Sequence, residues 1–140
     1  MASDRIDLLR RVPLFSDLER RELEELAGSL KERTFRAGET VAQEGQGAVG
    51  FFVIEDGVAR VTVRGEDRGR LGPGDYFGEI ALIAESARTA TITAETDLRC
   101  LGMTFWDFRP FVESNGRVAW KMLQALAKRL RDVESRGGDE

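Results

Sequence analysis

The residues from Gly78 to Arg88 are of the types that bind a phosphate group. Gly78 permits a backbone conformation or a close approach that a side chain would block, and residues 79–83 can form one helical turn directly after it. The free N–H groups at the start of such a turn attract anions. Arg88 follows at a loop's length and can return a planar, permanently charged guanidinium to the same place. The stretch therefore predicts a site that neutralises a phosphate without a metal ion.

Glu79 needs a reason to lie beside a phosphate beyond its favourable position at a helix start. In a 3′,5′-cyclic nucleotide the ribose 2′-hydroxyl stays free, so a carboxylate can accept its hydrogen while Arg88 and the amides hold the phosphate. Thr89 adds a hydroxyl that can face the base or the phosphate. The competing interpretation is a salt bridge from Arg88 to Glu79 or Glu85 that only closes the loop.

The composition removes most catalytic alternatives. The 140 residues contain no histidine and one cysteine, Cys100. Ser-His-Asp catalysis, Cys-His catalysis and histidine-ligated metal sites are therefore excluded, and a carboxylate-based or lysine-based enzyme is a minor option. Cys100 falls in a predicted strand, where we expect it to be buried and inert. We predict no enzyme activity, no cofactor and no metal.

The chain is expected to form one domain and to lie in the cytoplasm. A chain of 140 residues fits a single domain, and its formal net charge of -4 argues against nucleic-acid binding. The basic side chains of the last predicted helix are adequately explained as a solvated face. We expect no signal peptide or membrane span, because the first residues are charged and lack a long apolar run. A lone cysteine needs no oxidising compartment.

Helical patterns flank a central region rich in glycine. A short helix is expected at residues 3–11, and residues 16–31 show leucines at helical spacing, with Ser16 and Glu19 spaced as a capping box. Strands are expected at residues 32–35, 40–42, 50–55, 58–64, 89–94 and 98–103. Asp56-Gly57 between two apolar runs is typical of a hairpin turn. Many short strands with glycine-rich turns indicate a β-sandwich or barrel.

The C-terminal region predicts two helices. A short one lies near Pro110, and a longer one begins near Asn115 with an apolar stripe from Val118 to Val133. We expect the aromatic residues here to pack in the core; they are Phe105, Trp106, Phe108, Phe111 and Trp120. The predicted organisation is an N-terminal helical segment (1–31), a β-roll (32–103), C-terminal helices (104–135) and a polar tail (136–140).

The stretch from Phe77 to Thr91 resembles the phosphate-binding cassette of the cyclic nucleotide-binding domain family, which includes catabolite activator proteins and cyclic-AMP-dependent kinase regulatory subunits. Further short motifs typical of the family occur in the family's order along residues 8–133. They are Val12-Pro13-Leu14-Phe15, Gly38-Glu39, Glu44-Gly45, Phe52-Val53-Ile54, Gly57 and Gly74-Asp75. The resemblance implies a mainly β double-stranded β-helix, or jelly roll, with N-terminal helices and a C-terminal lid or hinge helix.

The resemblance also assigns roles to residues. The set expected at the ribose and cyclic phosphate is Phe77, Gly78, Glu79, Ile80, Ala81, Arg88, Thr89 and Ala90, with Leu71 and Val63 at the pocket wall. By the same resemblance, Arg88 anchors the phosphate and Glu79 takes the 2′-hydroxyl. Base or lid contacts are sought on the last helix at Arg129, Leu130, Val133 and Glu134.

Two features depart from the family's pattern. Ala87 stands where many cassettes have proline before the arginine, which loosens the loop but removes no binding group. The connection at residues 65–69 is short, and this alters one rim of the barrel. We also expect no DNA-reading helix pair after the last helix, unlike the transcription-factor branch of the family.

The sequence therefore predicts a regulatory module that binds cyclic AMP or cyclic GMP, with cyclic AMP slightly favoured. Occupancy would be transmitted by repositioning the last helix to an unidentified protein partner, and its apolar stripe could also join a second copy as a homodimer. The alternatives are a ligand-free interaction module on the same fold and, less favoured, a cupin-like enzyme. The sequence does not decide between the two nucleotides, and the chain could be a piece of a longer regulator.

Overall fold

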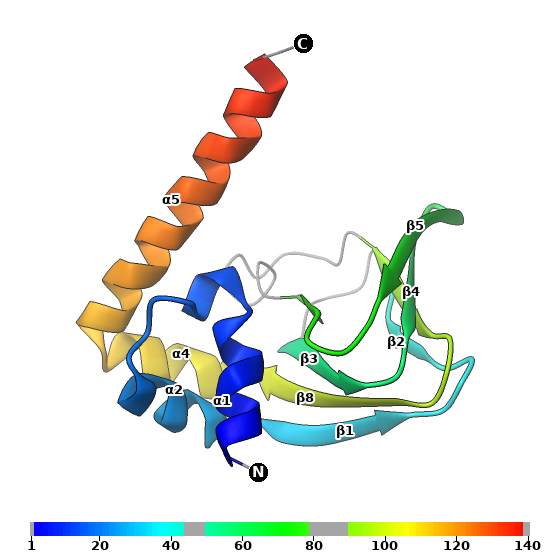
Figure 1. The fold of residues 1–140 in the computed structure, drawn as a ribbon, viewed down its shortest axis with the longest axis horizontal. Coiled ribbons are helices and arrows are strands. Elements are labelled where there is room, and N and C mark those ends of the chain that lie inside the picture. Colours follow the sequence, from blue (N-terminus) through cyan, green and yellow to red (C-terminus); the bar gives the residue numbers. More distant parts are fainter. Residues whose placement is uncertain (1, 44–49, 79–89, 139–140) are drawn as a thin grey trace.

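The computed structural model describes residues 2–43, 50–78 and 90–138 (Figure 1). The N-terminal helices are α1 (Ala2–Arg10), the 3₁₀ turn η1 (Pro13–Phe15) and α2 (Arg20–Ala27). The strands are β1 (Lys31–Phe35), β2 (Thr40–Ala42), β3 (Gly50–Asp56), β4 (Ala59–Val63), β5 (Glu66–Leu71), β6 (Tyr76–Phe77), β7 (Thr91–Ala94) and β8 (Leu98–Thr104). The C-terminal helices are α4 (Phe105–Glu113) and α5 (Gly116–Gly138).

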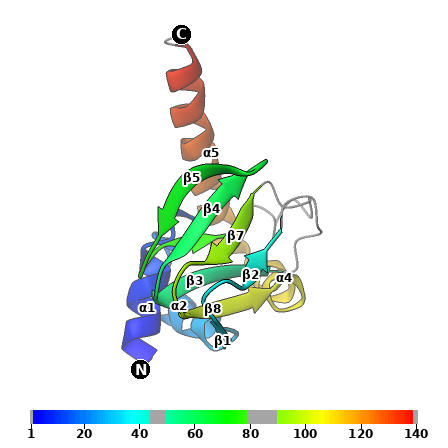
Figure 2. The same ribbon diagram turned by 90° about the vertical axis from the view of Figure 1, so that its right-hand side faces the viewer.

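The described strands form two four-stranded antiparallel sheets. The first sheet has the order β1-β8-β3-β6 and the second β2-β7-β4-β5. Consecutive strands repeatedly change sheet, so the two sheets are wound into one roll (Figure 2). The predicted mainly β jelly roll with flanking helices is confirmed.

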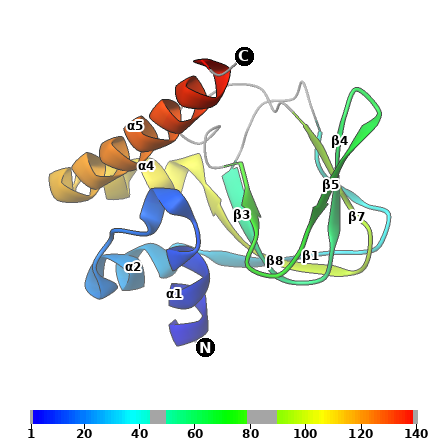
Figure 3. The ribbon, with the colours of Figure 1, turned by 45° about the horizontal axis from the view of Figure 1, so that its top comes forward.

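The first sheet is covered on both faces. Alternate residues of β3 point to opposite sides. Phe51 and Val53 join a core with the helices, while Ile54 joins a second core inside the roll. Figure 3 shows this arrangement, with the helices on one side of β3 and β8 and the second sheet on the other. The inner core is the apolar interior that any ligand in the roll would meet.

Among the described residues, the contacts that anchor helix α5 lie along its first half. Val118 and Met122 are buried in the helical core, and Leu126 packs against it. The second half projects beyond the rest of the domain (Figures 1 and 2), and the side chain of Leu130 is 59% exposed. The helix continues to Gly138, past the predicted start of a polar tail at residue 136, because extending an existing helix gains one hydrogen bond per residue.

The aromatic residues of the C-terminal helices divide into two groups. Phe108 and Phe111 are buried, as predicted. The prediction that Trp106 and Trp120 pack in the core is wrong, because they are 74% and 62% exposed. Each lies two positions from a buried residue on its helix, which directs it to nearly the opposite side. The side chain of Phe105 lies outside the described part.

Two local predictions for the helices and turns need correction. Helix α2 begins at Arg20, capped by Glu19 and Glu22, while the Ser16 hydroxyl donates to the carbonyl of Pro13 instead. The hairpin expected at Asp56-Gly57 is a crossing between sheets, because β3 pairs with β6 and β8 and never with β4.

The tight hairpin lies at Arg64-Gly65, between β4 and β5. Both residues have positive φ, 53° and 80°, as a two-residue turn matching the strand twist requires. Strand β5 therefore fills most of the stretch that the sequence suggested was a short connection.

Candidate functional site

The two ends of the predicted cassette are fixed in different sheets. Strand β6 ends at Phe77 on the edge of the first sheet, and β7 begins at Thr91 inside the second. Gly78 has a φ of +89°, a left-handed conformation that favours glycine. The described ends of the cassette, Gly78 and Ala90, therefore adjoin different sheets.

Five predicted ligand residues lie outside the described residues. They are Glu79, Ile80, Ala81, Arg88 and Thr89. Their expected roles at the phosphate and the ribose stay predictions.

Phe77 is buried in the inner core of the roll. Its ring centroid lies 5.4 Å from that of Phe52, and Phe52 in turn meets Phe35 edge-on at 6.1 Å. The side chain of Phe77 is 9% exposed and packs in the core that contains Ile54 and Ile92. The residue that opens the cassette is thus held by aromatic packing, which fixes where the following backbone starts.

The turn before β6 is held by a local hydrogen-bond network. The backbone N–H of Gly72 donates to a carboxylate oxygen of Asp75 at 2.8 Å. The backbone N–H of Ile54 donates to the carbonyl of Asp75, and the N–H of Gly74 donates to the carbonyl of Ile54, each at 2.8 Å. Leu71, just before this turn, is half-buried against the inner core. These contacts tie the entrance of the cassette to the central strand β3.

Val63 and Ala90 lie at the other end of the cassette. The register of β4 and β7 pairs Val61 with Ile92 and Thr62 with Thr91, so Val63 and Ala90 come next along the two strands. Val61 and Ile92 belong to the inner core, and strand alternation places Val63 on the same face as Val61, while Ala90 directly precedes β7. Both are half-buried. Leu71 instead pairs with Ala59 at the far end of β4, so the two predicted wall residues are not adjacent.

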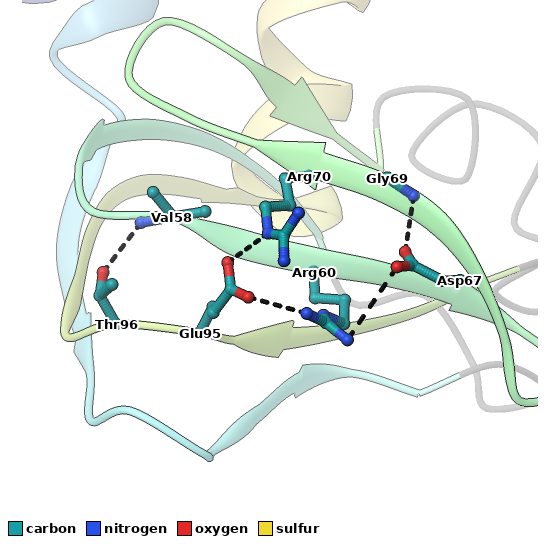
Figure 4. A network of polar contacts seen from close by, with 7 residues as sticks. All are labelled: Val58, Arg60, Asp67, Gly69, Arg70, Glu95 and Thr96. Atoms are coloured by element: carbon teal, nitrogen blue, oxygen red, sulfur yellow. Dashed lines mark hydrogen bonds and ion pairs between the residues drawn. The ribbon is translucent and has the colours of Figure 1, made fainter.

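The outer face of the second sheet carries an ionic network that the sequence analysis missed (Figure 4). Glu95 accepts from Arg70 at 2.6 Å and from Arg60 at 2.9 Å, and Asp67 lies 4.0 Å from Arg60. Hydrogen bonds from Arg70 and then Arg60 lower the pKa of Glu95. The network joins the β4-β5 hairpin to the end of β7. The sequence signal for this network was the alternation of side chains along β4, which places Arg60 on the face opposite Val61.

A cavity of about 390 Å³ opens between the edge strands β1 and β2. Lys31, Arg33 and Asp107 are the charged residues among its described lining, and Phe52 forms part of its apolar wall. None of the predicted ligand residues in the described part lines this cavity. Phe52 connects it to the cassette, because its ring also contacts Phe77.

The predicted lid residues lie on the projecting half of α5. Leu130 and Glu134 are exposed, and the side chains of Arg129 and Val133 lie outside the described part. Figures 1 and 2 show this end of the helix directed away from the rest of the domain. The structure therefore does not bring these residues to the roll, and their contacts with a base stay predictions.

Cys100 is buried, as predicted. Burial, followed by the nearby charge of Glu55, raises the pKa of its thiol to about 12, so the reactive thiolate is scarce near neutral pH. Within the described ranges, no three His, Cys, Asp or Glu side chains are arranged to hold a metal ion. Nor is any helix in those ranges long and apolar enough to cross a membrane.

Comparison with known proteins places these features in a family. The chain is 41% identical over 93 residues to a cAMP-dependent protein kinase regulatory subunit of Yarrowia lipolytica, a match covering 65% of this chain and 25% of the relative. The chain thus spans about a quarter of the length of that relative.

Two solved structures share the fold. The N-terminal domain of a transcriptional regulator from Streptomyces coelicolor A3(2) has a TM-score of 0.85 and 32% identity, covering 92% of this chain and 96% of that one. The catabolite activator protein of Thermus thermophilus has a TM-score of 0.72 and 26% identity, and the match covers 89% of this chain and 61% of that one. The family profile described as the cyclic nucleotide-binding domain matches residues 32–115. The chain therefore belongs to the cyclic nucleotide-binding domain family.

Proposed function

We propose that this chain binds a 3′,5′-cyclic nucleotide at the cassette between Gly78 and Ala90, and that it prefers cyclic AMP to cyclic GMP. One observation carries the proposal. Phe77-Gly78 and Ala90-Thr91 hold the two ends of the cassette in facing sheets, beside an apolar interior, in a chain of the cyclic nucleotide-binding domain family.

The proposed binding mode divides the ligand between charge recognition and apolar packing. Arg88 pairs with the cyclic phosphate, and Glu79 accepts the hydrogen of the ribose 2′-hydroxyl. Gly78, Ile80, Ala81 and Thr89 complete the surroundings of the phosphate and ribose. Val63 and Ala90 support the ligand from the inner face of the second sheet. No bond in the nucleotide is broken, so this activity is binding rather than catalysis.

The preference for cyclic AMP is supported by the relatives. The Yarrowia lipolytica relative is named as a regulatory subunit of a cAMP-dependent protein kinase. The Thr89 hydroxyl is chemically able to face guanine as well, so the proposed preference is one of degree.

The signalling step proposed here uses α5. Binding draws the projecting half of α5 towards the roll, where Arg129, Leu130, Val133 and Glu134 can meet the base. A protein partner that binds only one position of α5 then experiences a changed affinity when the nucleotide binds. The exposed Leu123 and Leu130 give such a partner, or a second copy of the chain, an apolar surface.

Isothermal titration with cyclic AMP and cyclic GMP tests the proposal. We expect saturable binding of both nucleotides at one site, with cyclic AMP the tighter. Tighter binding of cyclic GMP would overturn the base preference. No heat with either nucleotide, at protein concentrations well above the micromolar range, would instead favour the ligand-free interaction module.

A further inference from the structure

Glu22 is the one charged residue that is buried in the part of the chain the structure describes. Its side chain is 11% exposed, and that of its partner Lys121 is 17% exposed. The ammonium of Lys121 lies 3.2 Å from a carboxylate oxygen of Glu22. Glu22 belongs to α2 and Lys121 to α5, so this pair joins an N-terminal helix to the last helix across 99 residues of sequence.

The position of Glu22 is set by the cap of α2. The backbone N–H of Glu19 donates to the same carboxylate oxygen at 2.7 Å, which closes the capping box at the start of the helix. Glu19 is itself paired with Arg117, one turn before Lys121 on α5. The N-terminus of α2 therefore holds two successive turns of α5 through two ion pairs.

The Glu22–Lys121 pair, here called the inner pair, matters most for the energy because it is largely buried. Burial alone would raise the pKa of Glu22, but the Glu19 N–H, Lys121 and Arg117 together outweigh it, and the net pKa is lowered. The carboxylate is therefore ionised and satisfied in this arrangement. If α5 moved relative to α2, Glu22 would lose the counter-charge of Lys121, which is unfavourable for a carboxylate to the extent that it stays out of water.

No comparable attachment is found for the described side chains in the rest of α5. Beyond Leu126 the described side chains are exposed, and this half of the helix projects beyond the domain (Figure 1). The described contacts that fix the direction of α5 are therefore made by its first half, with α2, η1 and α4.

We propose that Glu22–Lys121, together with Glu19–Arg117, is an ionic clamp that holds α5 in its projecting position and opposes its closure onto the roll. This inference rests on the proposed function, since closure is the step that nucleotide binding would drive. Part of the binding energy of the nucleotide is then spent on moving α5 against the clamp. The clamp lowers nucleotide affinity and sets how strongly the empty domain favours the projecting position.

The test uses the full chain with both charges of the inner pair removed, as Glu22→Gln/Lys121→Met. Glutamine keeps an acceptor for the Glu19 N–H, and methionine keeps an apolar stem. The matched control is Arg20→Met/Glu24→Gln. The Arg20–Glu24 pair is also an ion pair between a basic residue and a glutamate, but it is exposed and lies within α2 alone. Circular dichroism and thermal unfolding confirm that each variant is folded, and Glu22→Gln alone serves if the double variant is not.

The first readout needs no nucleotide. Spin labels at Arg68→Cys on β5 and Glu134→Cys on α5 report the distance between the roll and the projecting end by pulsed electron resonance, while the buried Cys100 stays unlabelled. We expect the double variant to gain a shorter-distance population that the wild type and the control lack. An unchanged distance distribution would overturn the clamp.

The second readout is the affinity for cyclic AMP. We expect the double variant to bind about 3- to 10-fold more tightly than wild type, within the usual range of coupling between two sites, and the control to bind as wild type does. Equal affinities in all three proteins would overturn the coupling of the clamp to binding. A wild type that binds neither nucleotide would overturn the proposed function alone, because the spin-label distances still decide whether the clamp exists.

Discussion

The rings of Phe52 and Phe77 lie with their centroids 5.4 Å apart and their planes tilted by 32°, where the first sheet ends and the cassette begins. Phe52 stands on β3 and also lines the cavity between β1 and β2. The packing of this pair therefore sets the starting point of the backbone that we propose to hold the nucleotide. A change at Phe77 should affect both the stability of the roll and the affinity of the site.

Phe77→Leu tests this dual effect. The lost ring contact should lower the free energy of unfolding by about 1–2 kcal/mol, measured by urea denaturation followed by circular dichroism. Cyclic AMP affinity should fall as well, because the start of the cassette shifts. Phe35→Leu is the matched control, since it removes the other ring contact of Phe52 at a residue of β1, outside the cassette. Equal affinity losses in the two variants would show that Phe77 has no special link to the site.

Gly78→Ala tests whether the left-handed backbone at Gly78 is needed for nucleotide binding, as distinct from the loss of stability that such a substitution causes at any left-handed glycine. A side chain at φ +89° costs about 1–2 kcal/mol. Gly38→Ala carries the same penalty at φ +93°, and a Cβ there meets nothing within 4 Å. We expect similar losses of stability in the two variants by thermal unfolding, but weakened cyclic AMP binding only for Gly78→Ala. Nucleotide affinity reduced equally by both substitutions would contradict a role for Gly78 in the site.

The lowered pKa of Glu22 predicts how stability depends on pH. Because the folded-state pKa lies below the ordinary value of 4.5, the contribution of Glu22 to stability is present above pH 4.5. It is lost as the pH falls through the lowered folded-state pKa. Glu22→Gln should therefore be less stable than wild type near neutral pH, and the difference should shrink under acid conditions. A difference that stays constant between pH 7 and pH 3 in urea titrations would contradict the ionised pair.

Much of the fold could be predicted from the sequence because its signals are local. The glycine-rich spacing indicated short strands, and the strand expected at residues 89–94 is confirmed as β7. The helical repeat of residues 16–31 likewise marked α2, although the first turn begins four residues later than predicted. Such patterns depend only on neighbours along the chain.

The misses share a different cause. The sequence of strand β5, Glu66–Leu71, reads as a polar loop because its side chains are largely exposed, and it is extended because it pairs with β4. The clamp between Glu22 and Lys121 could not be predicted either, since its residues are 99 positions apart and each alone is an ordinary helix charge.

Calorimetric titration of cyclic AMP into wild type, Arg88→Ala and Arg33→Ala tests the central claim most directly. Arg33 lines the cavity between β1 and β2, so its variant reports whether the nucleotide sits there instead. We expect Arg88→Ala to bind at least about 30-fold more weakly, the loss that follows when a charged partner of a phosphate is removed, and Arg33→Ala to bind as wild type does. Wild-type affinity in Arg88→Ala, or a larger loss in Arg33→Ala, would contradict a nucleotide held by the cassette.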